Sequence, residues 1–294
     1  MQLSLLLGKA ACKRSQAKSR LLSPDFALPY FLLDRELRLD LAHYQKYQRL
    51  FRWQPERSEF IHPCYLHLLA FPLHLKIMTS SSFPFATLGL VHLGNQIEQH
   101  QPLNCFEKIL LRVSTASLQP HAKGWTFDIV SEAYQAGTLV WSSRSRNLYR
   151  LAGVAPIGQA AADVSPTLID ETQTAQTKDV LWHLPANLGC RYAAISGDFN
   201  LIHLHPWLAR MFGFKQHIVH GMWSKARVIS ELLGQEFRPF RCEVSFKKPV
   251  FLPAQVKLSH WQQQEQTRFM LLDDKDQQVD EAIVHMTGEL SYHD

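Results

Sequence analysis

Apolar and polar residues alternate along this chain in two regular patterns, and each pattern predicts one kind of secondary structure. One set of apolar residues recurs at helical spacing, at Ile218, Met222, Ala226, Ile229 and Leu233. This spacing predicts an amphipathic helix with one buried face. Residues 240–247 then alternate strictly between apolar and polar side chains, which is the period of a strand with one covered face. The pattern predicts a helix packed on a sheet.

The same order of elements occurs twice. In the second half, a strand near 180–183 and a short helix from Pro206 precede the long helix, and further strands are expected at 256–261, 268–272 and 282–290. In the first half, an apolar helix over 62–78 is followed by expected strands at 88–93, 107–116, 125–133 and 139–149. We therefore expect two structural duplicates of the α+β class, each with one long helix and an antiparallel sheet.

The duplication suggests where the units begin and end. Residues 152–178 are rich in small and polar residues, which favours a linker between the halves. We expect a first unit over 27–151 and a second over 179–294. Residues 1–26 carry scattered basic residues and are expected to be a loose N-terminal segment.

Composition excludes several classes of protein. The chain has 294 residues, 46% of them hydrophobic, and no run approaches the roughly 18 apolar residues of a membrane span. A net charge of +5, spread along the chain, does not indicate a nucleic-acid-binding protein. The five cysteines are far apart and form no C-x-x-C pair, so we expect reduced thiols and a cytoplasmic location.

The candidate chemistry is concentrated in residues 192–209. Asp198, Asn200 and His203 place a carboxylate, an amide and an imidazole within six residues, and such groups can bind one water molecule and move its proton. Taken singly, the same residues are also typical of structure alone, because Asp198 suits a turn, Asn200 a cap and His203 a buried hydrogen bond.

Other chemical signatures are absent from the sequence. The pairs His203-x-His205 and His217-x-x-His220 have no cysteines or carboxylates at a recognisable metal-ligand spacing, so we expect no metal. There is no G-x-S-x-G, G-x-G-x-x-G or Walker motif, which argues against hydride transfer and nucleotide hydrolysis.

Ser196-Gly-Asp-x-Asn-x-Ile-His203, followed fifteen residues later by Ile218-Val-His-Gly-Met222, resembles the signature of the MaoC-like dehydratase or hydratase 2 family. The resemblance implies a double hot-dog fold and an (R)-specific enoyl thioester hydratase of fatty acid metabolism. It also implies a catalytic pair, Asp198 and His203, supported by Asn200, with the Gly221 backbone N–H bound to the thioester carbonyl. The chain departs from the pattern at Leu201, where proline is usual, and at His205, where aspartate is common.

Substrate contacts are expected around this motif. The candidate residues are Ser196, Gly197, His220 and Met222, together with Lys247 and Lys248, which with Arg241 nearby are suited to coenzyme A or phosphopantetheine phosphates. The lysine pair is equally typical of a solvated strand end, and His220 of helix packing. We expect no cofactor, an acyl-CoA or acyl carrier protein thioester as substrate, and either a monomeric pseudo-dimer or a homodimer.

The first half lacks this motif near its helix start at residues 61–63, so we expect it not to catalyse. Its apolar helix over 62–78 suits either an acyl chain or core packing. Two other functions remain open, a hot-dog acyl thioesterase and a non-catalytic acyl-thioester-binding protein. A thioesterase of this fold uses a carboxylate on the long helix, where this chain has only Glu231.

Overall fold

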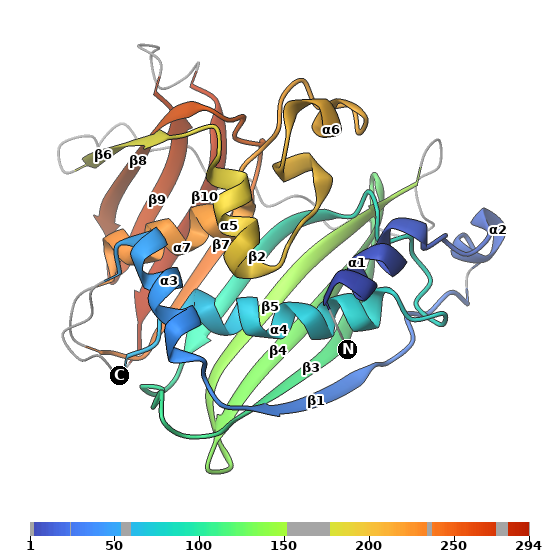
Figure 1. Cartoon of the computed structure of the whole chain (residues 1–294), viewed down its shortest axis with the longest axis horizontal. Coiled ribbons are helices and arrows are strands. Elements are labelled where there is room, and N and C mark those ends of the chain that lie inside the picture. Colours follow the sequence, from blue (N-terminus) through green and yellow to red (C-terminus); the bar gives the residue numbers. More distant parts are fainter. Residues whose placement is uncertain are drawn as a thin grey trace.

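The computed structural model describes residues 3–23, 25–53, 60–151, 177–233, 237–274 and 282–293. One ten-stranded sheet, antiparallel at every pairing, curves around the long helices α4 (Pro63–Met78) and α7 (Gly221–Leu232), as Figure 1 shows. The strands are β1 (Leu32–Leu37), β2 (Val91–Gln99), β3 (Ile109–His121), β4 (Gly124–Gln135), β5 (Thr138–Arg150), β6 (Lys178–Leu184), β7 (Phe240–Phe246), β8 (Ala254–Gln263), β9 (Gln266–Asp273) and β10 (Val284–Tyr292). The other helices are α1 (Leu3–Cys12), α2 (Lys18–Leu21), α3 (Leu41–Phe51), α5 (Leu188–Ser196), the 3₁₀ turn η2 (Leu201–His203) and α6 (Pro206–Arg210).

The strand order is symmetric about the middle of the sheet. It runs β1-β3-β4-β5-β2 in the first half and β7-β10-β9-β8-β6 in the second. Each half therefore has one edge strand, then a long helix, then four strands, and β2 pairs with β7 at the centre with Ile97 opposite Cys242. This arrangement confirms the predicted α+β double hot-dog class. Most of the expected linker, residues 152–176, lies outside the described residues.

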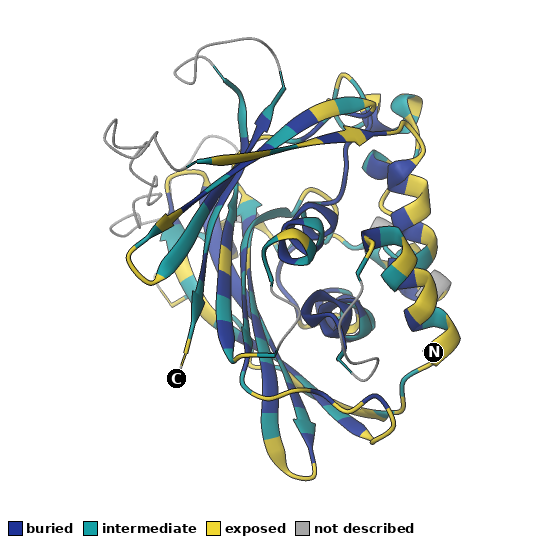
Figure 2. Cartoon of the chain, turned by 90° about the vertical axis from the view of Figure 1, so that its left-hand side faces the viewer, coloured by how far each residue is buried: buried dark blue, intermediate teal, exposed yellow. Residues whose placement is uncertain are grey.

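The two long helices are enclosed by the sheet. Twelve of the sixteen residues of α4 are buried, as expected for a helix that is apolar on nearly all sides. Figure 2 shows the two long helices end-on inside the curve of the sheet, with further helices on the side of them that faces away from the sheet. Across the part of the chain that the structure describes, no helix is both long and apolar enough to cross a membrane.

A buried lysine holds α7 to the centre of the sheet. The Lys225 ammonium is fully buried and donates hydrogen bonds to the main-chain carbonyl of Asn95 (2.8 Å), to its side-chain Oδ1 (2.7 Å) and to the carbonyl of Cys242 (3.0 Å). Asn95 lies on β2 and Cys242 on β7, so one side chain links the second helix to both halves.

Most of the predicted elements are confirmed, and the differences have physical causes. The predicted helix 62–78 is α4, and the strands expected after both long helices are present, with boundaries shifted by a few residues. The helix expected from Ile218 begins at Gly221, because Ile218 instead pairs with Phe251 in an isolated bridge. Helix α5 occupies a stretch expected to be a loop.

The N-terminal segment differs from expectation. Residues 1–26 were expected to be loose, yet α1 packs on α4, and the side chains of Leu6 and Leu21 are 3% and 1% exposed. Trp125 on β4 donates its indole N–H to the carbonyl of Leu21 (2.9 Å). Leu6 and Leu21 therefore belong to the hydrophobic core.

Candidate active site

The segment between β6 and α7 covers the N-terminal end of α7. Helix α5 ends at Ser196, and Gly197 closes it in the left-handed conformation (φ +73°), donating its N–H to the carbonyl of Ala193 (2.8 Å). The chain reverses there, and the Asp198 N–H donates to Ser196 Oγ (3.1 Å). Ser196 and Gly197 thus shape the turn that presents Asp198.

His203 is oriented by one hydrogen bond. Its Nδ1 lies 2.8 Å from the carbonyl oxygen of Ile218, which can only accept, so Nδ1 carries the proton and the neutral ring keeps a lone pair on Nε2. The side chain is 8% exposed and lies in η2. The ring is therefore held in the tautomer that can accept a proton at Nε2.

His220 lies against both members of the predicted pair. Its ring stacks on that of His203, with centroids 3.6 Å apart and planes inclined by 23°. Its Nε2 donates to the main-chain carbonyl of Asp198 (3.0 Å) and lies 3.8 Å from the carboxylate. His220 precedes α7 as its N-cap residue, and its Nδ1 is buried without a hydrogen-bond partner in the described residues.

Three side chains converge on a single point. Ligating atoms of Asp198, His203 and His220 all lie within 4.8 Å of one another. The Asp198 carboxyl is 28% exposed, whereas His220 is 3% exposed, so the cluster opens to solvent on the aspartate side. Carboxylate and imidazole at this separation can bind one small polar molecule between them.

Burial shifts the pKa values of this cluster. It raises the pKa of Asp198, an effect opposed by His203 and by the Asn200 N–H, which donates to the carboxylate (3.2 Å). Burial also lowers the pKa of His203, an effect opposed by Asp198, and holds the pKa of His220 well below its usual value. Both imidazoles are therefore neutral at neutral pH, and desolvation makes the Asp198 carboxylate a stronger base than an ordinary aspartate.

Gly221 begins α7 directly beside this cluster. A Cβ at this position would lie 2.8 Å from the ring of Phe246, so a larger residue would have to displace that ring. The N–H groups of a helix's first turn have no partner within the helix, and they lie at its positive end. Gly221 can thus offer a hydrogen bond to an oxygen bound near Asp198 and His203.

The other predicted site residues differ in their burial and in their contacts. Met222 is buried in α7, and the Asn200 side chain is exposed, so its observed contact with Asp198 is made by the backbone. Lys247 and Lys248 are exposed just after β7. Arg241 was expected near them but lies at the other end of β7, paired with Glu98 (3.7 Å) and Glu243 (3.0 Å).

Two departures from the family pattern are accommodated locally. Leu201 begins the 3₁₀ turn η2, so the chain bends there without proline. The His205 ring accepts a hydrogen bond from the Trp207 N–H (3.2 Å) and caps α6, as an aspartate would.

Gly189 is a site residue that our sequence interpretation missed. A Cβ at Gly189 would lie 2.0 Å from the carbonyl oxygen of His203, so only glycine lets α5 pack on η2 at this distance. A glycine inside a helix is the signal that marks such close contacts in a sequence.

Comparison with known proteins agrees with this geometry. The MaoC like domain matches residues 169–283, which include the whole cluster. A 3-hydroxyacyl-thioester dehydratase X from Mycobacterium tuberculosis is 30% identical over 194 residues, covering 66% of this chain and 67% of that protein. This chain belongs to the MaoC-like dehydratase family.

Two further comparisons cover different extents of the chain. An (R)-specific enoyl-CoA hydratase from Aeromonas caviae is 42% identical over 71 residues, which are 22% of this chain and 52% of that protein. The crystal structure of HtdX from Mycobacterium tuberculosis superposes with a TM-score of 0.73 at 24% identity, covering 90% of this chain and all of that one. The structural match extends the shared fold to both halves.

Proposed function

We propose that this chain catalyses the reversible hydration of trans-2-enoyl thioesters to (R)-3-hydroxyacyl thioesters, with Asp198 and His203 binding the reacting water. The observation that carries the proposal is the convergence of the Asp198 carboxylate and the His203 ring beside the N-terminus of α7. Membership of the MaoC-like family, whose curated members named above are a dehydratase and a hydratase, supports hydro-lyase activity on acyl thioesters.

The proposed reaction needs a base, a proton donor and a stabiliser of negative charge. The Asp198 and His203 pair takes a proton from water while the water oxygen bonds to C3 and the C2–C3 π electrons move toward the thioester oxygen. The same proton then returns from the pair to C2, which restores the carbonyl. Because one water serves both carbons from one face, the addition is syn.

The Gly221 N–H is the proposed donor to the thioester oxygen as it becomes enolate-like. Its place at the N-terminus of α7 adds the helix dipole to that hydrogen bond. Loss of one such donor typically costs about 3 kcal/mol of transition-state stabilisation. The exposed Lys247 and Lys248 are proposed to contact the phosphates of the thioester carrier.

The residues also support a water site rather than a metal site. His203 Nδ1 and His220 Nε2 already donate to the carbonyls of Ile218 and Asp198, so a metal at either nitrogen would break a buried hydrogen bond. His203 Nε2 and the Asp198 carboxylate can both accept a hydrogen bond from one water molecule placed between them.

A thioesterase function is less well supported. The carboxylate of α7, Glu231, lies near the far end of the helix and pairs with Arg227 (3.0 Å). Ten residues of helix place it about 15 Å along the axis from Gly221. It is therefore too far away to attack a thioester held at Gly221.

The test is hydration of a short trans-2-enoyl-CoA, followed by loss of the enoyl absorbance. We expect Asp198→Asn and His203→Ala each to lower kcat/KM by about 100- to 10,000-fold while circular dichroism stays unchanged. The matched controls Asp25→Asn and His183→Ala replace exposed residues of the same types and should retain full activity. Chiral chromatography of the product should show the (R) isomer.

Wild-type-like turnover in either site variant would refute the assigned pair. A dominant (S) product would mean that other residues bind the water. We include in the proposal a cytoplasmic location and a role in fatty acid metabolism. The location is supported by the cysteines, none of which forms a disulfide.

A further inference from the structure

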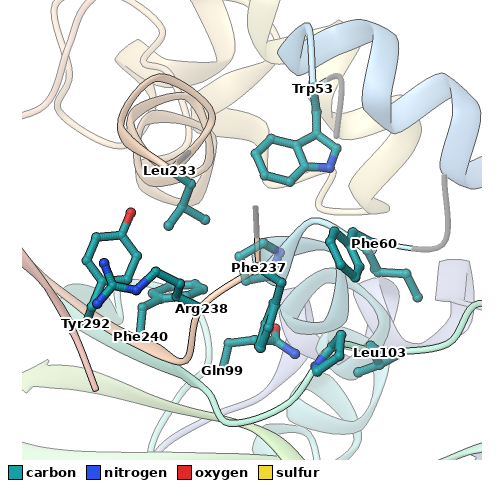
Figure 3. A pocket seen from close by; sticks show the side chains of 12 residues that line it. Trp53, Phe60, Gln99, Leu103, Leu233, Phe237, Arg238, Phe240 and Tyr292 are labelled. Carbon is teal, nitrogen blue, oxygen red and sulfur yellow. The ribbon is translucent and has the colours of Figure 1, made fainter. Parts of the chain in front are cut away.

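The start of α4 does not repeat the active site at the start of α7. Both helices follow a buried histidine at the N-cap, His62 or His220, but α4 begins with Pro63, which has no backbone N–H to donate. The His62 ring accepts from the Cys64 N–H (3.1 Å) and donates to the carbonyl of Ala226 (3.2 Å). The described residues that line the small pocket beside Pro63 include neither a carboxylate nor a histidine (Figure 3). A contribution of this half to proton transfer therefore has to be indirect.

Helix α3 of the first half lies beside α5, the helix that leads into the turn Ser196–Asp198 (Figure 1). We call these three residues the Asp198 turn. The His43 Nε2 on α3 lies 2.9 Å from the main-chain carbonyl oxygen of Ile195 on α5. A carbonyl oxygen can only accept, so Nε2 carries the proton and donates. One side chain of the first half is thus bonded to the residue that directly precedes the Asp198 turn.

The position of the Ile195 carbonyl explains why a donor from outside α5 stabilises it. The last four carbonyls of an α-helix have no partner within the helix, and they lie at its negative end. The Gly197 N–H donates to the carbonyl of Ala193, and the Asp198 N–H donates to Ser196 Oγ. The Ile195 carbonyl receives its donor from α3 instead. The first half therefore supplies one of the hydrogen bonds that fix the end of α5.

His43 is itself held in the orientation that this bond requires. Its backbone N–H donates to Oδ1 of Asp40, the N-cap residue of α3 (3.0 Å), and its Nδ1 accepts from the Tyr65 hydroxyl (2.7 Å). Tyr65 is fully buried in α4, and burial raises the pKa of its hydroxyl, which keeps its proton at neutral pH. The ring is thus fixed in the tautomer that donates from Nε2.

A second contact between α3 and α5 reaches the active-site cluster through aromatic rings. The Phe51 ring at the end of α3 meets the Tyr192 ring edge-on, with centroids 6.1 Å apart and planes inclined by 85°. The Tyr192 ring in turn lies 4.7 Å from that of His220. Tyr192 and Ile195 are three residues apart, so they lie on one face of α5. Helix α3 therefore contacts one face of α5 from both of its own ends.

We propose that His43 is a positioning residue of the active site, through which the first half fixes the Asp198 turn of the second. His43 acts through the Ile195 carbonyl and does not touch the reacting atoms. The expected effect on turnover rests on the proposed hydratase function. The expected effect on the order of the Asp198 turn does not depend on it.

The kinetic test compares His43→Ala with His43→Gln in the hydration of a short enoyl-CoA. His43→Ala should lower kcat about tenfold and leave KM within about twofold, because the turn moves while the carrier contacts stay in place. His43→Gln can present an amide N–H to the Ile195 carbonyl and should restore most of the lost activity. Tyr65→Phe keeps Nε2 but frees the ring, so it should lower kcat by less than His43→Ala.

Hydrogen–deuterium exchange of the full chain tests the order of the turn without turnover. The peptide over residues 196–203 should exchange about fivefold faster in His43→Ala than in the wild type, because the end of α5 loses a fixed hydrogen bond. The matched control Gln45→Ala, exposed on α3, should change neither exchange nor kcat. His74→Ala removes a buried first-half histidine bonded to Ser131 (2.7 Å). It should lower thermal stability but leave kcat and the exchange of this peptide unchanged.

The outcomes separate this proposal from the proposed function. Unchanged exchange of residues 196–203 in His43→Ala would overturn it, and so would wild-type kcat in that variant or equally low activity in His43→Gln. Tyr65→Phe, which keeps His43, provides the same two readouts if His43→Ala does not fold. A wild-type protein without hydration activity would refute the proposed function instead, and the exchange measurement would still decide whether His43 fixes the Asp198 turn.

Discussion

Asp198 and His203 lie in surroundings that move their pKa values toward each other. Desolvation raises the pKa of the aspartate from 3.8 and lowers that of the histidine from 6.5. Because the two groups interact, their protons are lost in steps that belong to the pair rather than to either residue. Both groups must be deprotonated to accept a proton from water. The loss of activity at low pH therefore reports the protonation of the pair.

We predict that kcat/KM for hydration is constant above about pH 7 and falls as the pH drops below the ordinary histidine value of 6.5 toward 3.8. The value of kcat/KM decreases at low pH because protonation of either group removes a base. The measurement is a pH profile with a short enoyl-CoA, and circular dichroism at each pH controls for unfolding. An activity loss that begins between pH 9 and pH 7 would contradict this assignment.

At the scale of elements, the short helix α5 has the most direct effect on the active site. It places Ser196 and Gly197 before Asp198, and it packs on the backbone of His203 through Gly189. The N-cap residues of α6 and α7 are both histidines, and the two have different roles. His205 accepts a backbone N–H with its ring, whereas His220 makes no such cap and donates to Asp198 instead. The same residue type thus stabilises one helix and orients the active site at another.

We predict that Gly189→Ala lowers both stability and activity. The new Cβ would approach the carbonyl of His203, and relieving that contact should cost about 1–3 kcal/mol of unfolding free energy. Displacement of η2 by about 1 Å should lower kcat about 100-fold. Thermal unfolding and the hydration assay measure the two effects.

The matched control is Gly8→Ala, since a Cβ there meets nothing within 4 Å and the backbone is helical. This variant should keep wild-type activity and be as stable or slightly more stable. If Gly189→Ala behaved like Gly8→Ala, the packing of α5 on η2 would not position His203.

At the scale of the whole molecule, the first half contains three neighbouring histidines on α4 and β2. His67 and His74 are buried, and His92 is half-buried. The His67 ring lies 5.3 Å from that of His74 and 6.4 Å from that of His92. Burial lowers the pKa of His74 to about 3 and that of His92 to about 4. These rings stay neutral in the folded protein at pH values where the unfolded chain binds protons.

We predict that the free energy of unfolding decreases as the pH falls from 6.5, because the unfolded state then binds more protons than the folded state. Each such histidine contributes about 1.4 kcal/mol per pH unit near pH 5. The double variant His74→Leu, Ser131→Ala removes the ring and its 2.7 Å hydrogen-bond partner together. Urea unfolding should show a pH slope shallower by that amount, whereas His183→Leu, at an exposed position, should leave the slope unchanged.

The sequence by itself determined the features that depend on local order. Helix α4 and the strands after both long helices were predictable because a periodic apolar pattern can be recognised within a single segment of the chain. The segment from Ser196 to His203 was predictable as a chemical motif for the same reason. Its residues are close in sequence, so a single turn brings Asp198 near His203.

The tertiary structure decided what depends on distant contacts. Strand β1 and helix α5 are short, and they are ordered by packing on other elements. The Lys225 ammonium finds its acceptors on Asn95, 130 residues away. A small pocket lined by Pro63 and Leu233 forms only where the end of α7 meets the start of α4. Local sequence specifies which elements form, but a buried cation such as Lys225 is stable only because the folded chain brings its hydrogen-bond acceptors together.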